Sequence, residues 1–218
     1  MSSNAVPSIN PSNNHDLAGM LTHTLGKTIQ NIHCKLPAKI ISYDRTANRA
    51  SVQLMIMLLT TDNSTFSRAP IAEVPVFQYG SGEFFISFNL KAGDLGWIDA
   101  SDRDISLFLQ TYSEEAPNTI RNHDFADGVF YPDIMTKYTI QSEDAENMVI
   151  QNLDGSTKIT LGASNIKIKH PTLVTIDAPS VVCTGTISAT DVIYNGISAI
   201  NHVHVGVTSG ASNTGVSH

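Results

Sequence analysis

The segments Ser156-Thr157-Lys158-Ile159-Thr160-Leu161 and Asn165-Ile166-Lys167-Ile168-Lys169 decide the fold of the C-terminal part of the chain. Alternate residues of a strand face opposite sides, so each segment offers only two or three apolar side chains. Similar short segments recur from Tyr138 to Ile200, separated by glycine, proline and Asx residues. A single chain built in this way has too few apolar residues to bury a core of its own.

Three such chains wound around one axis would bury these apolar residues. Each chain would form one wall of a prism, with isoleucine and valine side chains inside. The outward positions would stay in contact with water, namely Thr157, Lys158 or Thr160, Lys167, Lys169, Thr175 and Asp177. A β-solenoid of one chain is the alternative, but its coils need about 20 residues each, so ~60 residues would make only about three. The pattern therefore favours an intertwined trimeric β-helix.

The sequence Asn201-His202-Val203-His204 follows this region. In an extended strand, His202 and His204 point to the same side. Two imidazoles from each of three chains would supply six nitrogen ligands, an octahedral set that suits a late first-row divalent ion better than magnesium or calcium. A pair of solvated histidines is the other interpretation of so short a motif.

The N-terminal part of the chain predicts one helix and a small β-barrel. Apolar residues recur at helical spacing between Leu17 and Ile32, with Asn14 or Asp16 available as the N-cap. This helix would either pack on its own domain or dock on a partner. Strands are expected at residues 38–43, 50–57, 71–78, 84–90 and 105–109, and after the glycine turn in Lys91-Ala92-Gly93-Asp94-Leu95-Gly96-Trp97-Ile98. This series indicates a Greek-key barrel of the OB type.

Core packing is the predicted role of most aromatic residues of this barrel, because they are not interleaved with Arg or Lys as a nucleic-acid groove requires. They are Phe66, Phe77, Tyr79, Phe84, Phe85, Phe88 and Trp97. Residues 110–136 are predicted to be irregular. Within them, His123, Asp124 and Asp127 fit ordinary turn chemistry better than a metal or acid–base site.

Composition limits the possible functions. The 218 residues carry a net charge of -7, which argues against a nucleic-acid partner because attraction to phosphate dominates such binding. Residues 1–14 lack the pattern of an export signal, and no apolar run reaches the roughly 20 residues that span a bilayer, so we expect synthesis in a cytoplasm without export. Cys34 and Cys183 lack Cys-x-x-Cys spacing, which gives no basis for a disulfide or zinc site.

Taken in this order, the chain resembles the membrane-piercing central spike proteins of contractile-tailed bacteriophages. The residues that carry the resemblance are Leu90 to Ile98, Arg121 to Pro132, the short-strand repeat and Asn201-His202-Val203-His204. The resemblance covers roughly residues 30–205 and implies an OB-fold domain, a trimeric β-helix and an apex that holds one iron ion per trimer. It assigns His202 and His204 as the ligands, and Gly206 to His218 extend beyond the motif.

The expected organisation is mainly β and has five parts. These are a flexible leader and amphipathic helix at 1–33, an OB-fold domain at 34–117, a connector at 118–137, the trimeric β-helix at 138–200, and a metal-binding apex and tail at 201–218.

The resemblance implies a structural, non-enzymatic homotrimer at the tip of the tail baseplate of the virion. It would be assembled in the host cytoplasm, dock on tail hub or baseplate proteins and contact the outer membrane of a Gram-negative host transiently while piercing it. A receptor-binding fibre tip, which would bind through Gly206 to His218, is one alternative. A cell-wall or glycan hydrolase is another, for which Glu114-Glu115 and Asp102/Asp104 are the only close carboxylate pairs in candidate clefts.

Overall fold

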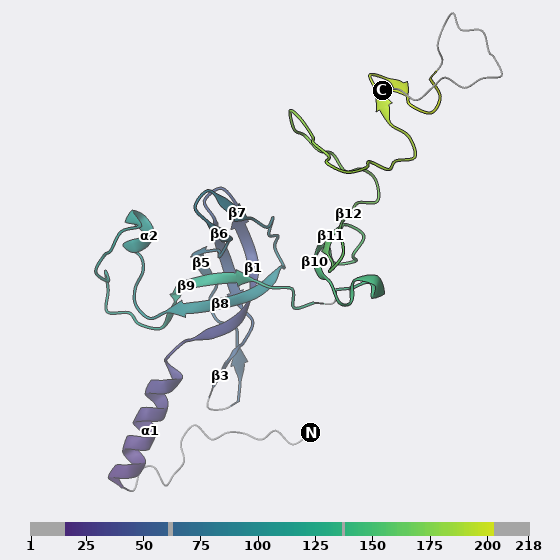
Figure 1. Cartoon of the computed structure of the whole chain (residues 1–218). Helices are drawn as coiled ribbons and strands as arrows, with labels where there is room; N and C mark the ends of the chain where they lie inside the picture. The colour runs from purple at the N-terminus through teal and green to yellow at the C-terminus, as the bar shows by residue number, and fades with distance from the viewer. Residues whose placement is uncertain (1–15, 61–62, 137, 203–218) are drawn as a thin grey trace, which may run out of the picture. The chain divides into compact units, whose positions relative to one another are not determined.

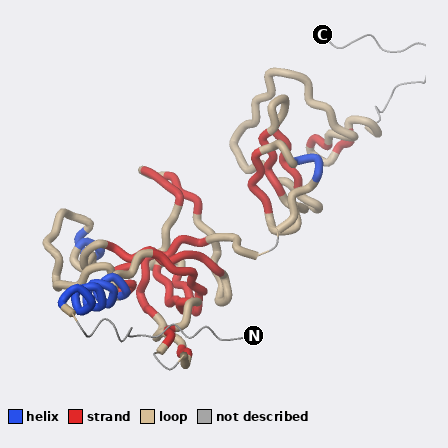
Figure 2. Tube along the Cα trace, turned by 90° about the horizontal axis from the view of Figure 1, so that it is seen from below, coloured by secondary structure: helices blue, strands red, loops and turns tan. Residues whose placement is uncertain are grey.

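The computed structural model describes residues 16–60, 63–136 and 138–202, and it divides the chain into two compact units at residues 168/169. The described chain is mainly β, as predicted. Helical structure in it is confined to short segments (Figures 1 and 2), which are α1 (Leu17–Gln30), α2 (Phe108–Thr111) and the 3-10 turn η2 (Ser142–Asp144). None of the helices in the described ranges has the length and apolar character that crossing a membrane requires.

Helix α1 confirms the helix predicted from the spacing of apolar residues. Asp16 is its N-cap, and the Asp16 side chain accepts a hydrogen bond of 2.6 Å from the backbone N–H of Gly19. The helix ends at Gln30, with Asn31 as the C-cap. No residue of α1 is buried.

Five antiparallel strands form the main sheet of the first unit, in the order β5-β2-β1-β8-β9. Their bounds are Ile71–Pro75 (β5), Arg49–Leu54 (β2), Lys35–Asp44 (β1), Leu95–Ser101 (β8) and Asp124–Pro132 (β9). The pairing of β1 with β2 confirms the predicted first hairpin. Two small hairpins lie outside this sheet, β3 (Leu58–Leu59) with β4 (Thr65–Phe66), and β6 (Tyr79–Ser81) with β7 (Phe84–Ile86).

The two edges of the five-stranded sheet meet and nearly close a barrel. Val76, just after β5, forms a parallel bridge with Phe130 of β9, and the N–H of Phe77 donates to the carbonyl of Phe130 at 2.8 Å. Around the barrel, the third strand in chain order therefore meets the fifth, while the first lies between the second and the fourth. This connectivity is that of a partly open OB-type barrel, which confirms the predicted barrel class.

The core of the barrel is built from aliphatic residues and two phenylalanines, Phe125 and Phe130. The predicted role of the other aromatic residues was wrong. All seven aromatic residues named above are exposed, from 37% for Trp97 to 82% for Phe84. Several belong to the β6–β7 hairpin, which pairs only with itself in the described structure, so its side chains never reach the barrel interior.

The predicted glycine turn joins β8 to the start of the barrel. Gly93 has a φ of 102°, a conformation that favours glycine, and its N–H donates to the carbonyl of Ile40 at 2.9 Å. Gly96 allows a close approach, because a Cβ at this position would lie 2.3 Å from the Tyr131 carbonyl oxygen and 2.4 Å from the Phe130 ring. Both glycines therefore hold neighbouring strands close together.

Two segments differ from the prediction. Residues 105–109 do not form a strand: backbone bonds from Leu109 to Ile105 and from Thr111 to Leu107 wind them into a helical turn that leads into α2. The fifth barrel strand is instead β9, which lies in residues 110–136, predicted to be irregular. The Asp and Gly residues of β9 are typical of turns. Here they belong to a strand of the sheet, and Arg121 donates hydrogen bonds to the carboxylate of Asp127. The remaining predicted domain limits stay predictions.

Residues 138–168 contain a second, three-stranded sheet in the order β10-β11-β12. Its strands are Met148–Gln151 (β10), Lys158–Leu161 (β11) and Ile166–Lys169 (β12). The expectation that Lys158 or Thr160 faces water was wrong, since both are buried while Ile159 and Leu161 are each 39% exposed. The polar face of β11 packs against η2 because Asp144 lies there as a partner. The apolar face of β11 therefore points outward in the single chain.

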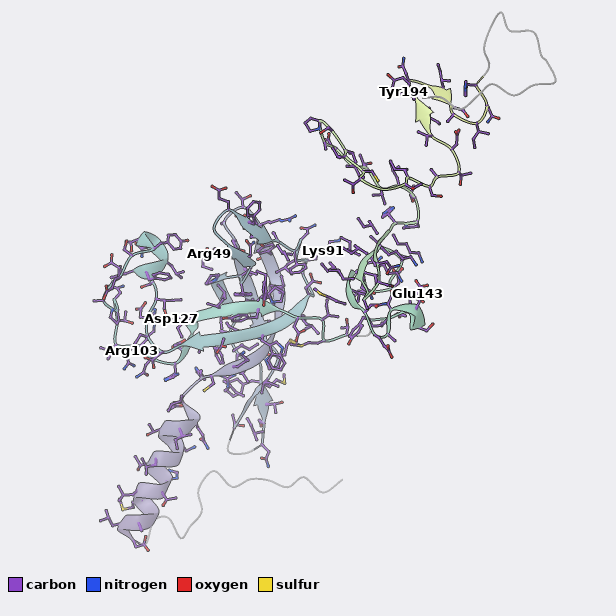
Figure 3. The ribbon with its side chains drawn as sticks, viewed as in Figure 1. Arg49, Lys91, Arg103, Asp127, Glu143 and Tyr194 are labelled. Carbon is purple, nitrogen blue, oxygen red and sulfur yellow. The ribbon has the colours of Figure 1, made fainter. Side chains whose placement is uncertain are left out.

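In the second unit, residues 170–192 contain no helix or strand. The short hairpin β13 (Ile193–Tyr194) and β14 (Ile197–Ser198) follows them. Tyr194 on β13 is labelled in Figure 3. From residue 169 to residue 202, every described residue is exposed except Ser198, which is half-buried.

Candidate functional site

The hairpin β13–β14 leads directly into the predicted apex. Asn195 and Gly196 at its turn have φ values of 48° and 81°, the left-handed pair that tight two-residue hairpins use. Asp191 accepts hydrogen bonds from the backbone N–H groups of Val192 at 2.8 Å and Ile200 at 3.3 Å. Hydrogen bonds from Ser198 and from these N–H groups lower the pKa of Asp191, which keeps it an acceptor. The hairpin thus fixes the chain up to the residue before Asn201.

His202 has one ring nitrogen in a defined contact. Its Nδ1 lies 2.9 Å from the carbonyl oxygen of Ala199. A carbonyl oxygen only accepts, so Nδ1 is the donor in this contact. Metal-bound histidines are commonly oriented by such a bond from the other ring nitrogen. The Nδ1 contact of His202 is therefore of the kind that orients a histidine side chain for metal binding.

His204, the second predicted ligand, lies outside the described residues, as do Gly206 to His218. The predicted shared orientation of His202 and His204 therefore stays a prediction. Among residues 16–60, 63–136 and 138–202, no group of three or more His, Cys, Asp or Glu side chains has an arrangement that could hold a metal ion. The proposed site draws its ligands from three chains, so a trio within one chain is not what it requires.

Many apolar side chains between residues 166 and 200 are exposed. Ile166 and Ile168 on β12 are 71% and 60% exposed, and Val182 is 83% exposed. Further exposed apolar residues of this region are Leu173, Val174, Ile176, Val181, Ile187, Val192, Ile193, Ile197 and Ile200. The backbone of residues 170–192 also lacks strand partners in the described part of the chain. Exposed apolar side chains and backbone groups without strand partners are features that contact surfaces between chains share.

A buried ion cluster anchors the beginning of this region (Glu143 is labelled in Figure 3). The side chain of Lys158 is fully buried and its Nζ bonds to Asp144 and, at 2.7 Å, to Glu143. The Thr160 hydroxyl also donates to Asp144 at 3.1 Å. The bond from Lys158 lowers the pKa of both Asp144 and Glu143, and the two carboxylates raise the pKa of Lys158. The cluster therefore fixes η2 on the polar face of β11.

A second network occupies the loop between β8 and β9. Arg121 donates to Asp127 through Nε at 2.9 Å and Nη2 at 3.0 Å, and it lies 3.3 Å from Asp104 (Asp127 is labelled in Figure 3). Hydrogen bonds from Ser106, then from Thr119, and the charge of Arg121 hold the pKa of Asp104 well below its usual range. A carboxyl group kept ionised in this way is an acceptor and is poorly suited to donate a proton as a general acid.

The candidates for other chemistry in this loop have ordinary structural partners. The carboxylate of Asp124 accepts from the N–H of Ala126 at 2.8 Å, and His123 Nε2 lies 3.3 Å from Asp102. The turn interpretation of this cluster was wrong for Asp124 and Asp127, because both lie in strand β9, where Asp127 pairs with Arg121. Sequence reasoning missed both ion networks, because their partners lie up to 17 residues apart and no local motif connects Asp104 to Arg121 or Asp144 to Lys158.

Comparison with known proteins gives a match for the barrel. No curated protein matches the chain. Residues 36–133, which extend from β1 to just past the end of β9, match the family described as the phage protein Gp138 N-terminal domain. This match confirms the resemblance to a phage structural protein in the region of the barrel. Over residues 36–133, the chain is thus similar to a phage protein domain, the N-terminal domain of the Gp138 family.

Proposed function

We propose that this protein is the structural spike at the tip of a contractile phage tail, a homotrimer that pierces the outer membrane of a Gram-negative host. The similarity of the barrel to a phage protein domain supports a structural role in a phage particle. The barrel is the proposed base that docks on tail hub or baseplate proteins. Residues 138–202 are the proposed shaft, and the tail sheath supplies the force, so the chain needs no turnover.

The observation that carries this proposal is which side chains of the shaft strands are buried within one chain and which point outward. On β11, the chain covers its own polar residues and leaves Ile159 and Leu161 outward. Beyond β12, residues 170–192 are exposed and have no strand partner among the described residues. Three intertwined copies would cover this apolar face and pair this backbone at once. Stiffness follows, because bending one strand would expose apolar residues of all three chains.

The metal belongs to the same proposal. His202 and His204 from each chain would hold one iron ion on the threefold axis, and the contact of His202 Nδ1 with the Ala199 carbonyl is of the kind that orients a histidine ligand. When bound, the ion supplies a cross-link between three chains at the narrowest part of the shaft. The side chains of this chain supply only the ligands and their orientation.

Two variants of strand β12 test the shaft. Ile166→Asn/Ile168→Asn changes its apolar face, and the control Lys167→Asn/Lys169→Asn changes the opposite face of the same strand. We expect the wild type and the lysine variant to have the solution mass of three chains, and the isoleucine variant to lose it. A wild-type chain with the mass of one copy would contradict the trimer.

The apex is tested separately by elemental analysis of wild type and His202→Ala/His204→Ala. We expect about one iron per three chains in the wild type, as an octahedral site of six imidazoles requires, and none in the variant. Phage particles that carry the β12 isoleucine variant should still adsorb to the host but fail to infect. Loss of adsorption instead would favour a receptor-binding fibre tip.

A further inference from the structure

Helix α1 carries an apolar stripe that nothing in the described structure covers. Leu17, Leu21, Leu25 and Ile29 follow one another in steps of four residues along one face of the helix, and Ile32 follows three residues later, just after the C-cap. Their exposed fractions are 72%, 55%, 60%, 65% and 44%. The stripe contains no charged residue, and His23, Lys27 and Gln30 lie on the opposite face.

The length of the helix makes a partner necessary. Isolated helices of fewer than about 12–15 residues are marginal in water, and most helices are stabilised by packing of an amphipathic face. Helix α1 has 14 residues and contains Gly26, which costs about 1 kcal/mol relative to alanine. An uncovered stripe gives such a helix no source of packing energy within its own chain.

The chain that leaves α1 is held at the barrel within a few residues of the end of the helix. The N–H of His33 donates to the carbonyl of His123 at 3.2 Å, and the His33 ring stacks on Phe125 with a centroid distance of 4.6 Å. The carbonyl of Cys34 accepts from Ala100 at 2.7 Å. The C-terminal end of α1 therefore cannot move far from its own barrel.

We propose that the stripe of α1 packs against α1 of two further copies of this chain, as a parallel three-helix bundle. This step rests on the proposed trimer. Rotational symmetry would make the three helices parallel and would bring the same residue of each chain to the same level. Leu17, Leu21, Leu25 and Ile29 would then form successive apolar layers. Steps of four residues exceed the 3.6 residues of a helical turn, so the stripe drifts around the helix and favours a slight right-handed twist of the three helices.

The size of the stripe favours further copies over an unrelated partner. A buried Leu or Ile contributes about 1.5–3 kcal/mol at ~25 cal/mol per Å², which corresponds to about 60–120 Å² for each residue and about 300–600 Å² for the stripe. A stable interface between separate proteins needs roughly 800 Å² per partner. Helices tethered to one trimer instead meet at an effective concentration in the millimolar range, which lets a small contact form.

Cross-linking across the threefold axis tests this bundle. In the full chain with Cys34→Ser and Cys183→Ser, we compare Leu25→Cys, within the stripe, with His23→Cys on the opposite face. A short bismaleimide cross-linker should join chains of the Leu25→Cys protein about tenfold more than chains of the His23→Cys protein, because only position 25 would lie at the axis. Covalent dimers on a denaturing gel are the readout, and solution mass is measured on the same samples.

Each result decides between the two proposals. A trimer that cross-links at position 25 supports the bundle. A trimer that cross-links equally at both positions, or at neither, overturns the bundle but leaves the trimer standing, and the stripe then belongs to another tail protein. A protein with the mass of one chain overturns both.

Discussion

The barrel and the shaft use the same residue types in opposite ways. Ile98 in the barrel is completely buried, whereas Ile166 in the shaft is 71% exposed. In the barrel, strands far apart in sequence pair with one another, and the bridge between Val76 and Phe130 closes the sheet over its own core. In the proposed shaft, residues 170–192 contain no strand that pairs with another described strand. Whether a hydrophobic residue is buried therefore depends on strand pairing, not on its own chemistry.

The largest difference is expected when one buried and one exposed phenylalanine of the same barrel are truncated. Phe130→Ala should reduce the free energy of unfolding by about 3–5 kcal/mol, because it removes a ring that is 0% exposed. Phe84→Ala, at 82% exposure, should change it by less than about 0.5 kcal/mol. Denaturant unfolding followed by fluorescence measures both, since Trp97 on β8 is the single tryptophan of the chain. Equal losses would mean that the β6–β7 hairpin also packs in the folded protein.

A pair of glycines gives a smaller expected difference. Gly96→Ala should cost about 1–3 kcal/mol, because the added methyl group would overlap the Phe130 ring and the Tyr131 carbonyl. Gly185→Ala in the second unit should lie within about 0.5 kcal/mol of the wild type, since an added methyl group would have no atom of the described chain within 4 Å beyond its immediate neighbours. Thermal unfolding of the two variants checks this. A loss of trimer in Gly185→Ala would show that the shaft is packed at this residue between chains.

The smallest expected effect is on the acid stability of the barrel. The pKa of Asp104 is lowered in the folded state, so its stabilising contribution is present above the ordinary aspartate pKa of about 4 and is lost as the pH falls below it. The free energy of unfolding of Asp104→Asn should therefore fall less steeply between neutral and acidic pH than that of the wild type. Glu114→Gln, an exposed position in the same loop, is the control and should follow the wild type. A wild-type slope in Asp104→Asn would contradict the role of the Ser106 and Thr119 bonds.

Local patterns were sufficient for part of the fold. The apolar spacing of α1, the hairpin β1–β2 and the glycine turn at Gly93 each depend on residues close in sequence, and each was predicted. Strand β9 was not, because Asp127 and Gly128 are typical turn residues. Arg121 satisfies Asp127, and Gly128 fits under Ile98, whose side chain would lie 2.8 Å from an added Cβ. Neither long-range partner leaves a signal next to the residue it serves.

The candidate site shows the same limit. The sequence placed His202 just after a series of short strands, and the structure adds the contact of its Nδ1 with the Ala199 carbonyl. It could not indicate that Lys158 is buried, because a lysine between apolar residues usually faces water. The partner that makes burial possible, Asp144, lies 14 residues earlier in a 3-10 turn. Charged residues with a distant partner are therefore the positions where alternation alone assigns the wrong face.

The Lys158–Asp144 pair has a consequence for the order of assembly. It gives residues 138–168 a structure that one newly made chain can reach alone, like the barrel before it. Residues 170–192 have no such internal partner and would wait for two further chains. Winding would then start at the strand that this ion pair fixes and proceed toward the C-terminus. The ion pair would thereby determine which residues of the three chains meet first, before the rest of the shaft forms.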